Sequence, residues 1–207
     1  MITYNQFIEA FPQAKVENVA KHYPSLVKAM QQFDINTTLR QAHFLTQAAW
    51  ETMFFAKMVE NMNYSAKGLM ATWPKRFTKL EDALPYNRKP EAIGNFVYGG
   101  RNGNNQSEGY KYRGRGMFHY TFKSSYQLLD KKFAKRLDGE SFVATPELLE
   151  QEPWASLSAG YYWDLNKLNS HADKDNLRAI RVAINGGLLG FEECVSILKG
   201  VKEVLGC

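Results

Sequence analysis

The chain has 207 residues, a net charge of +5, a pI of about 9.1 and 44% hydrophobic residues. This length suits one domain or two small ones, and 13 Phe and 11 Tyr residues suffice for a proper core. No run of about 18 apolar residues is present that could form a membrane-spanning helix. The modest positive charge favours acidic partners such as nucleic acid, anionic lipid or an anionic wall polymer. It is equally consistent with a charge that has no partner and serves only solubility.

The N-terminal segment does not have the pattern of a signal peptide. Residues 1–15 are amphipathic, contain Glu9, and lack both a basic n-region and an apolar h-region. We therefore expect the protein to be made and folded in a cytosol, so that any action outside that compartment needs another exit route.

The cysteine and histidine content predicts neither a disulfide framework nor a metal site. Only two cysteines are present, Cys194 and Cys207, and the four histidines are scattered with no cysteine beside them. We expect reduced thiols, no metal and no cofactor.

Apolar residues recur at helical spacing along most of the chain, most clearly over residues 36–55. In chain order, helices are predicted at 36–55, 64–73, 90–99, 122–134, 145–166, 173–187 and 189–206, with a Gly- and Asn-rich loop at 99–116. Ser65 is a plausible N-cap, Pro90 suits a first helical turn, and Gly186 suits a helix stop. The sequence predicts one compact, mainly α domain over residues 1–207, with little or no β-sheet.

Two carboxylates, Glu51 and Glu60, flank a mostly apolar run. On one continuous helix they would point to opposite sides, because nine residues turn the chain by about 900°. The Asn-rich segment 60–65 favours a turn that would bring Glu60 back towards Glu51. Inverting glycoside hydrolysis needs two carboxyl groups roughly 6.5–9.5 Å apart. The apolar neighbours Trp50, Met53 and Phe54 would favour the neutral form of Glu51, while Glu60 would stay ionised. A pair of solvated acids remains the commoner alternative.

Several motifs, in order, resemble those of glycoside hydrolase family 19, especially its phage endolysin branch. They are "AHFLTQAAWET", "ENMNYSAKGL", "NFVYGGRNGNN", "YKYRGRGMFHYT" and "AINGG", which together cover roughly residues 40 to 190. The resemblance implies a single lysozyme-like domain with a central substrate groove. It also implies inverting hydrolysis of a β-1,4 bond in an N-acetylated glycan.

The resemblance also implies roles for individual residues. Glu51 matches the general acid, Glu60 the general base, and Thr121 the hydroxyl residue that helps hold the attacking water. Asn185 matches a substrate-binding asparagine. The arginines of the "RGRG" segment, Arg113 and Arg115, either line the groove or pair with acids inside the fold.

The sequence departs from the family pattern beside these residues. Trp50 stands where a histidine usually precedes the first glutamate, and His119 stands where a glutamine is usual. Trp50 either stacks on a sugar or belongs to the core, and His119 either contacts substrate or is structural. Tyr64 is one of several tyrosines near the motifs that either line the groove or pack with the hydroxyl at the surface.

The expected activity is hydrolysis of the glycan strands of peptidoglycan, causing host cell lysis. A chitinase acting on GlcNAc polymers and a glycan-binding protein with impaired catalysis are the alternatives. No nucleic-acid-binding motif is recognised, so we expect no nucleic acid partner.

The expected protein is a monomer that waits in the host cytoplasm until a holin releases it to the periplasm and cell wall. The C-terminal helix, residues 189–206, carries Lys199 and Lys202 opposite an apolar face. It either packs against the domain or makes weak contact with an anionic envelope surface.

Overall fold

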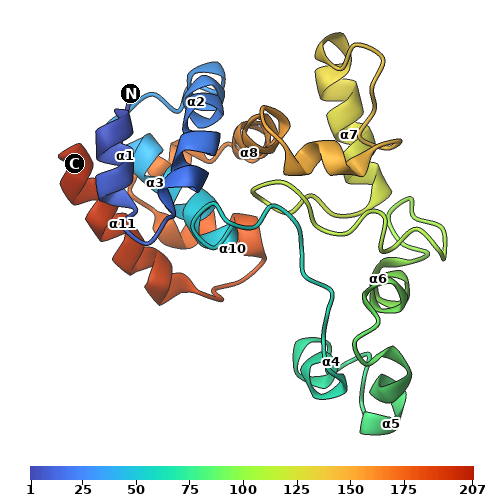
Figure 1. Ribbon diagram of the computed structural model, residues 1–207. Helices are drawn as coiled ribbons and strands as arrows, with labels where there is room; N and C mark the ends of the chain where they lie inside the picture. Colours follow the sequence, from blue (N-terminus) through green and yellow to red (C-terminus); the bar gives the residue numbers. More distant parts are fainter. The chain divides into compact units, whose positions relative to one another are not determined.

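The computed structural model describes residues 1–207, and the regular secondary structure of the chain is almost entirely helical (Figure 1). The helices are α1 Tyr4–Ala10, α2 Val16–Gln32, α3 Thr38–Glu51, α4 Ala66–Thr72, α5 Leu80–Ala83, η1 Leu84–Tyr86, α6 Pro90–Tyr98, α7 Lys123–Phe133, η2 Ala134–Arg136, η3 Pro146–Glu150, α8 Trp154–Leu165, α9 Asn169–Ala172, α10 Leu177–Asn185 and α11 Phe191–Leu205. Extended pairing is limited to isolated bridges of Arg115 with Val59 and Tyr120. The mainly α fold class is confirmed. No helix has the length and apolar character needed to cross a membrane.

The chain forms two compact units, which are described in turn. The first contains residues 1–58, 116–118 and 148–207, and the second contains residues 59–115 and 119–147. Because both units are built from segments distant in sequence, neither corresponds to one continuous stretch of chain. A single catalytic domain over residues 1–207 stays a prediction.

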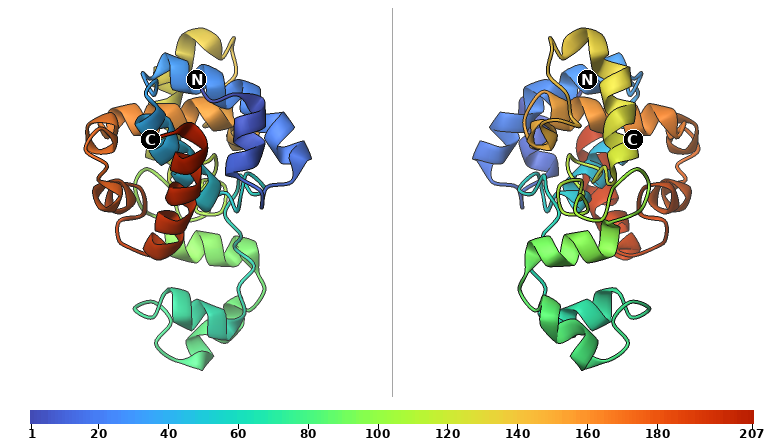
Figure 2. Two further views of the ribbon diagram at one scale, coloured as in Figure 1. Left: turned by 90° about the vertical axis from the view of Figure 1, so that its left-hand side faces the viewer. Right: turned by 90° about the vertical axis from the view of Figure 1, so that its right-hand side faces the viewer.

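Helix α3 is the central element of the first unit. All nine residues from Gln41 to Ala49 are buried. The small side chains of Ala42, Ala48 and Ala49 allow neighbouring helices to approach closely, and α3 packs against both α9 and α11. Figures 1 and 2 show α11 running beside α3. A helix buried on nearly all sides positions its last residue, Glu51, rigidly.

The close packing of α2 against α8 depends on a glycine. A Cβ at Gly160 would lie 2.3 Å from the ring of Phe33, which follows α2. Phe33 is itself buried and stacks near Tyr161 at 6.4 Å between ring centroids. Substitution of Gly160 would therefore push the two helices apart.

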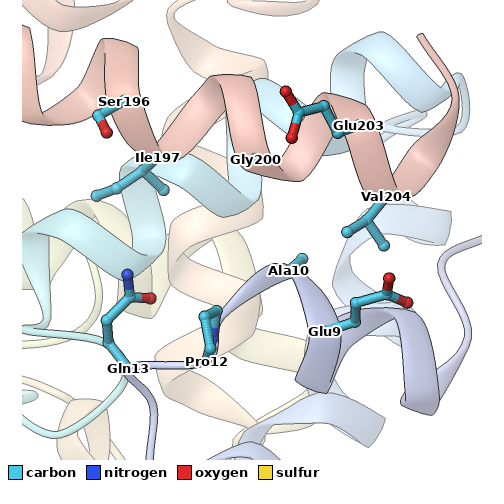
Figure 3. Close-up of a pocket in the computed structure, with 9 residues that line it drawn as sticks. All are labelled: Glu9, Ala10, Pro12, Gln13, Ser196, Ile197, Gly200, Glu203 and Val204. Carbon is cyan, nitrogen blue, oxygen red and sulfur yellow. The ribbon is translucent and has the colours of Figure 1, made fainter.

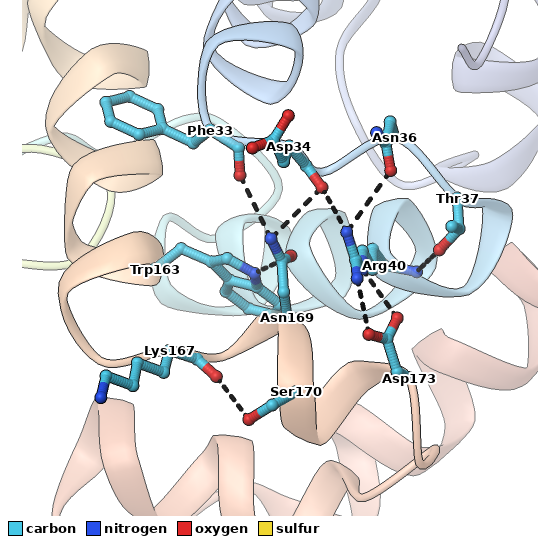
Figure 4. Close-up of polar contacts among 10 residues, drawn as sticks. All are labelled: Phe33, Asp34, Asn36, Thr37, Arg40, Trp163, Lys167, Asn169, Ser170 and Asp173. Atoms are coloured by element: carbon cyan, nitrogen blue, oxygen red, sulfur yellow. Dashed lines mark hydrogen bonds and ion pairs between the residues drawn. The ribbon is translucent and has the colours of Figure 1, made fainter.

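Polar contacts connect the ends of α2, α3, α8 and α9 (Figure 4). Arg40 in the first turn of α3 makes a two-point ion pair with Asp173, with Nε–Oδ1 and Nη2–Oδ2 distances of 2.7 and 2.6 Å. Asn169 accepts a hydrogen bond from the indole of Trp163 at 2.8 Å and donates to the carbonyl of Phe33 at 3.2 Å. These contacts fix the N-terminal end of α3.

The C-terminal helix α11 uses its apolar face inside the fold. Cys194, Leu198 and Val201 are buried, and α11 packs against α1 and α3. This burial favours the alternative of ordinary packing against the domain, and weak contact with an anionic envelope surface stays a prediction. A cleft of about 390 Å³ lies between α1 and α11, with Glu9 and Glu203 among its lining residues (Figure 3). It contains none of the candidate site residues.

The second unit has a smaller core formed by α4, α5 and α6. Its buried residues are Met62, Ala66, Leu69, Phe77, Ala83, Ile93 and Val97. Partly buried aromatic residues pack on this cluster, among them Tyr64, Trp73 and Tyr98. The cluster thus supports Tyr98, which donates a hydrogen bond to Glu60, and Tyr64, whose pKa burial and Glu60 both raise.

Two predicted helices end or divide differently from expectation. The helix predicted over 36–55 ends at Glu51, because the three residues Met53, Phe54 and Phe55 have φ values of +51°, +56° and +64°. The helix predicted over 145–166 is a short turn, η3, followed by α8. Pro153 explains the division, since proline cannot donate an interior helical hydrogen bond.

We expect the free energy of unfolding to fall as the pH is lowered from about 7 to about 5. His43 is fully buried, and its Nε2 lies 2.8 Å from Oδ1 of Asp175. Burial lowers the pKa of His43, although Asp175 opposes this. Below the ordinary histidine pKa of about 6.5, the unfolded chain binds a proton at His43 more readily than the folded chain does. The free energy of unfolding therefore decreases as the pH falls from about 6.5 through the pKa of His43 in the folded chain. Urea denaturation of the wild type and His43→Gln measures this. An equally steep pH dependence in the variant would contradict the assignment.

Candidate active site

Glu51 is the last residue of α3, and the backbone leaves the helix immediately after it. Thr52 stabilises this exit, since its hydroxyl donates to the carbonyl of Ala48 and accepts from the amide of Phe55 at 2.8 Å. The side chain of Glu51 is 15% exposed. Because α3 ends at Glu51, no further helical turn covers its carboxylate on that side.

The carboxylate of Glu51 forms an ion pair with Arg181 of α10. The guanidinium of Arg181 is 1% exposed, and it also donates from Nη1 to Oε1 of Gln47 at 3.3 Å and from Nε to the carbonyl of Leu189 at 2.8 Å. A buried guanidinium requires such partners, because an unpaired charge in the interior is costly. Glu51, Gln47, Arg181 and Leu189 are called the Glu51 cluster below.

This cluster corrects the expected surroundings of Glu51. The neighbour Met53 is 68% exposed and does not bury the acid in an apolar environment. A nearby guanidinium stabilises the charged form of a carboxylate. The charge of Glu51 is also felt by Tyr162, whose pKa is raised by burial and by this carboxylate. Burial raises the pKa of Cys194 to about 11, so the thiol beside the cluster is neutral.

Two predicted substrate-binding residues lie in the same unit as Glu51. Trp50 is half-buried, and a Cβ at Gly190 would lie 2.3 Å from its indole ring. Gly190 has φ +74°, so this close approach depends on glycine for both space and conformation. Asn185 is exposed at the end of α10, directly before the left-handed cap Gly186. Trp50 therefore packs on the α10–α11 loop, and Asn185 is accessible to a ligand.

Glu60 lies in the second unit and is held by three hydrogen bonds. Its amide donates to the carbonyl of Gly114 at 2.8 Å, and its Oε2 accepts from the amide of Gly114 at 3.2 Å. Its Oε1 accepts from the hydroxyl of Tyr98 at 2.8 Å. These hydrogen bonds fix the position and orientation of the Glu60 carboxylate, and a general base must be held within reach of the proton that it removes.

The structure brings His119 close to Glu60 through Gly114. A Cβ at Gly114 would lie 3.0 Å from Cβ of His119 and 3.4 Å from Oε2 of Glu60, so a side chain there would have to displace its neighbours slightly. Thr121, two residues later, donates its hydroxyl proton to the carbonyl of His119 at 2.8 Å. The oxygen of Thr121 retains lone pairs that can accept a hydrogen bond from water.

Two tyrosines respond to the charge of Glu60. Burial raises the pKa of Tyr98, and the charge and hydrogen bond of Glu60 raise it further. Burial also raises the pKa of Tyr64, with Glu60 acting in the same direction, and the ring of Tyr64 packs edge-on against Trp73 at 5.0 Å. Both phenols therefore remain neutral donors near the carboxylate. Glu60, Tyr98, Gly114 and His119 are called the Glu60 cluster below.

The two arginines of the "RGRG" segment differ in exposure and partners. Arg115 is 1% exposed, and its guanidinium lies 3.0 Å from Oε1 of Glu147. It therefore follows the alternative of internal pairing, which corrects the expectation that it contacts substrate. Arg113 is half-buried and lies over the ring of Tyr110 at 4.0 Å. Its assignment to substrate stays a prediction.

Arg181, Gln47 and Tyr98 were not predicted as site residues from the sequence. A signal for Arg181 was present, because it lies on the same helical face as Leu177 and Ile180, both of which are buried. A charged residue on an apolar face needs a buried partner. No comparable signal identifies Tyr98, which is one of 11 tyrosines. The structure contains no group of three or more His, Cys, Asp or Glu side chains arranged to hold a metal ion.

We expect Tyr98→Phe to reduce kcat about tenfold, because a hydrogen bond to a charged group contributes about 1.5 kcal/mol or more. The ring and its packing on Phe122, at 5.3 Å between centroids, are retained. Tyr86→Phe, which changes an aromatic residue of the same unit, serves as the matched control. Unchanged kcat in Tyr98→Phe would exclude a role for this hydrogen bond.

Comparisons with known proteins identify the class to which the chain belongs. A protein of Haemophilus influenzae, strain Rd, described as "Glycosyl hydrolase family 19 domain-containing protein", is 32% identical over 196 residues. The match covers 93% of this chain and 92% of the relative. A scan against protein-family profiles finds no match.

Solved structures with the same fold include chitinase C from Streptomyces griseus, with a TM-score of 0.62 and 19% identity over 99% of this chain and 76% of that one. A bacterial family 19 chitinase aligns with a TM-score of 0.64 and 17% identity, covering 99% of this chain and 95% of that one. The protein is a glycoside hydrolase by fold and sequence. It belongs to glycosyl hydrolase family 19.

Proposed function

We propose that the protein is an endolysin that hydrolyses β-1,4 glycosidic bonds in the glycan strands of peptidoglycan. The observation that carries this proposal is the pair of glutamates, each held by dedicated hydrogen-bond donors, in a chain of family 19. The net charge of +5 suits an anionic wall polymer. Action on the wall follows release from the host cytoplasm through a holin.

In the proposed inverting reaction, Glu51 protonates the leaving glycosidic oxygen while Glu60 removes a proton from water. The bond between the anomeric carbon and the leaving oxygen breaks as the bond to the water oxygen forms. Thr121 accepts a hydrogen bond from the attacking water, and Asn185 binds the glycan. Arg181 opposes protonation of Glu51, so we propose that proton uptake by Glu51 accompanies the productive state.

Chitin hydrolysis is the second candidate function. It is favoured by the similarity of the fold to two proteins described as chitinases. Chitin and peptidoglycan share N-acetylated sugars and β-1,4 linkages, so both functions use the same two glutamates.

A comparison of purified sacculi with GlcNAc oligomers, using the purified protein, separates the two functions. We expect new reducing ends from sacculi, and mass spectrometry of the digest then identifies which sugar carries the reducing end. Release from GlcNAc oligomers alone would establish the chitinase. Binding to sacculi without new reducing ends would overturn both enzymatic functions.

A further inference from the structure

A cavity of about 360 Å³ opens at the end of α4 in the second unit. Its lining residues are Thr72, Trp73, Pro74, Lys75, Arg76 and Arg101. Three of these six side chains are cationic and none is acidic. None of them belongs to the Glu60 cluster.

The cations of this cavity are not neutralised by acidic side chains. Arg76 donates to the backbone carbonyl of Phe96 at 3.3 Å, and Arg101 donates to that of Val97 at 3.2 Å. Neither these guanidinium groups nor the ammonium of Lys75 takes part in an ion pair with a carboxylate. The two carbonyl contacts orient the arginines and leave their positive charge available to an anion.

An aromatic wall accompanies these charges. Trp73 is half-buried at the C-cap of α4, where its ring is fixed by the edge-on contact with Tyr64. Its indole N–H donates to no protein group. A fixed indole with a free donor suits the apolar face and hydroxyl groups of a pyranose. The combination therefore suits a sugar that carries an anionic substituent.

Two chains of contacts connect this cavity to Glu60 within the second unit. Trp73 packs on Tyr64, whose pKa is raised in part by Glu60. Arg101 lies over the ring of Phe122 at 5.3 Å, and Phe122 packs edge-on against Tyr98 at 5.3 Å. Tyr98 in turn donates its hydrogen bond to Glu60. The cavity is thus connected to the proposed general base through a few side chains in contact.

We propose that this cavity is a subsite for a carboxylate carried by a sugar residue of the substrate, and that it favours acidic N-acetylated glycans over neutral ones. The inference rests on the proposed glycosidase function and gives a physical basis for choosing peptidoglycan over chitin. Arg76 and Arg101 bind the carboxylate, with Lys75 adding positive charge, while Trp73 contacts the sugar ring.

Calorimetric binding with Glu60→Gln as the non-hydrolysing background tests the proposal. The probes are a GlcNAc tetramer, a peptide-free tetrasaccharide alternating GlcNAc and N-acetylmuramic acid, and the same tetrasaccharide bearing its peptides. We expect an acidic probe to bind about tenfold more tightly than the neutral tetramer, and the preference to shrink as salt is raised. Preference for the peptide-free probe assigns the carboxylate to the lactyl group, and preference for the peptide-bearing probe assigns it to the peptide.

The variant Arg76→Gln/Arg101→Gln, in the same Glu60→Gln background, should abolish this preference by weakening the binding of the acidic probe, while the affinity for the neutral GlcNAc tetramer changes little. Lys67→Gln/Lys79→Gln removes two exposed charges from the same unit outside the cavity and should keep the preference. If circular dichroism shows that the double variant is unfolded, Arg101→Gln alone replaces it, because Arg101 is exposed.

Equal affinity for acidic and neutral probes, or a preference that survives Arg76→Gln/Arg101→Gln, would overturn the subsite. These results differ from failure of the proposed function, in which wild-type protein releases no reducing ends from any glycan. In that case, an acidic preference that is lost in Arg76→Gln/Arg101→Gln would still support the cavity as a carboxylate-binding site.

Discussion

Glu51→Gln is expected to lower the rates of lysis of permeabilised cells and of hydrolysis of purified sacculi by about a hundredfold or more, which is the range of general acid catalysis. Glutamine preserves the shape of the side chain and an oxygen that can accept from Arg181, but it cannot supply a proton to the leaving oxygen. The fold is expected to persist, with a loss of about 1–3 kcal/mol in the free energy of unfolding, because the buried guanidinium loses its counter-charge. Reducing-end release and urea denaturation measure the two effects separately.

The exposed residue Glu203 supplies the control for this experiment, since Glu203→Gln makes the same chemical change in the cleft between α1 and α11, outside the Glu51 cluster. It should leave the rate unchanged. If the Glu51→Gln variant cleared cells as fast as the wild type, Glu51 would have no role in the reaction, and the two-carboxylate mechanism would be excluded.

Local sequence signals predicted several helix ends correctly because the residues that determine them are adjacent. Ser65 caps α4 by accepting the amide of Gly68 at 3.1 Å. Gly186 ends α10 in the left-handed conformation, with φ +75°. Ser65 supplies a hydrogen-bond acceptor for a nearby amide, and Gly186 can adopt a positive φ without strain. Both requirements involve only residues that are close in sequence.

The turn after Glu51 could not be predicted in the same way. Met53, Phe54 and Phe55 adopt positive φ values without a glycine among them, so the usual sequence signal for this conformation is missing. The burial of Phe55, which is 1% exposed and packs on Phe7 and Phe11, accompanies this conformation. A tertiary contact with α1, more than 40 residues away, therefore outweighs local preference.

The charged partners of the site residues also could not be predicted from their neighbours in the sequence. The neighbours of Glu51 in sequence suggested an apolar environment, but its main partner, Arg181, is 130 residues away. In the same way, Arg115 is paired with Glu147 and not with a ligand. The motifs predict roles for both glutamates, while the pairing of each arginine depends on how segments distant in sequence pack.

Arg181→Met is expected to reduce the free energy of unfolding by about 3–5 kcal/mol, because it leaves a partly buried carboxylate without its counter-charge. The carbonyl of Leu189 and Oε1 of Gln47 also lose a donor. Urea denaturation measures the loss. Arg178→Met, on the same helix but exposed, should change stability by less than about 0.5 kcal/mol. A loss in Arg181→Met as small as that in Arg178→Met would show that the ion pair contributes little.

The double variant Glu51→Gln/Arg181→Met separates the ion pair from the packing of the arginine stem. If the cost of Arg181→Met comes from stranding the charge of Glu51, the double variant should be more stable than Arg181→Met alone by about 1–3 kcal/mol. If the cost comes from lost packing, the two losses should add. Recovery of stability without recovery of hydrolysis is the expected result, because the same carboxylate that Arg181 stabilises must also donate the proton.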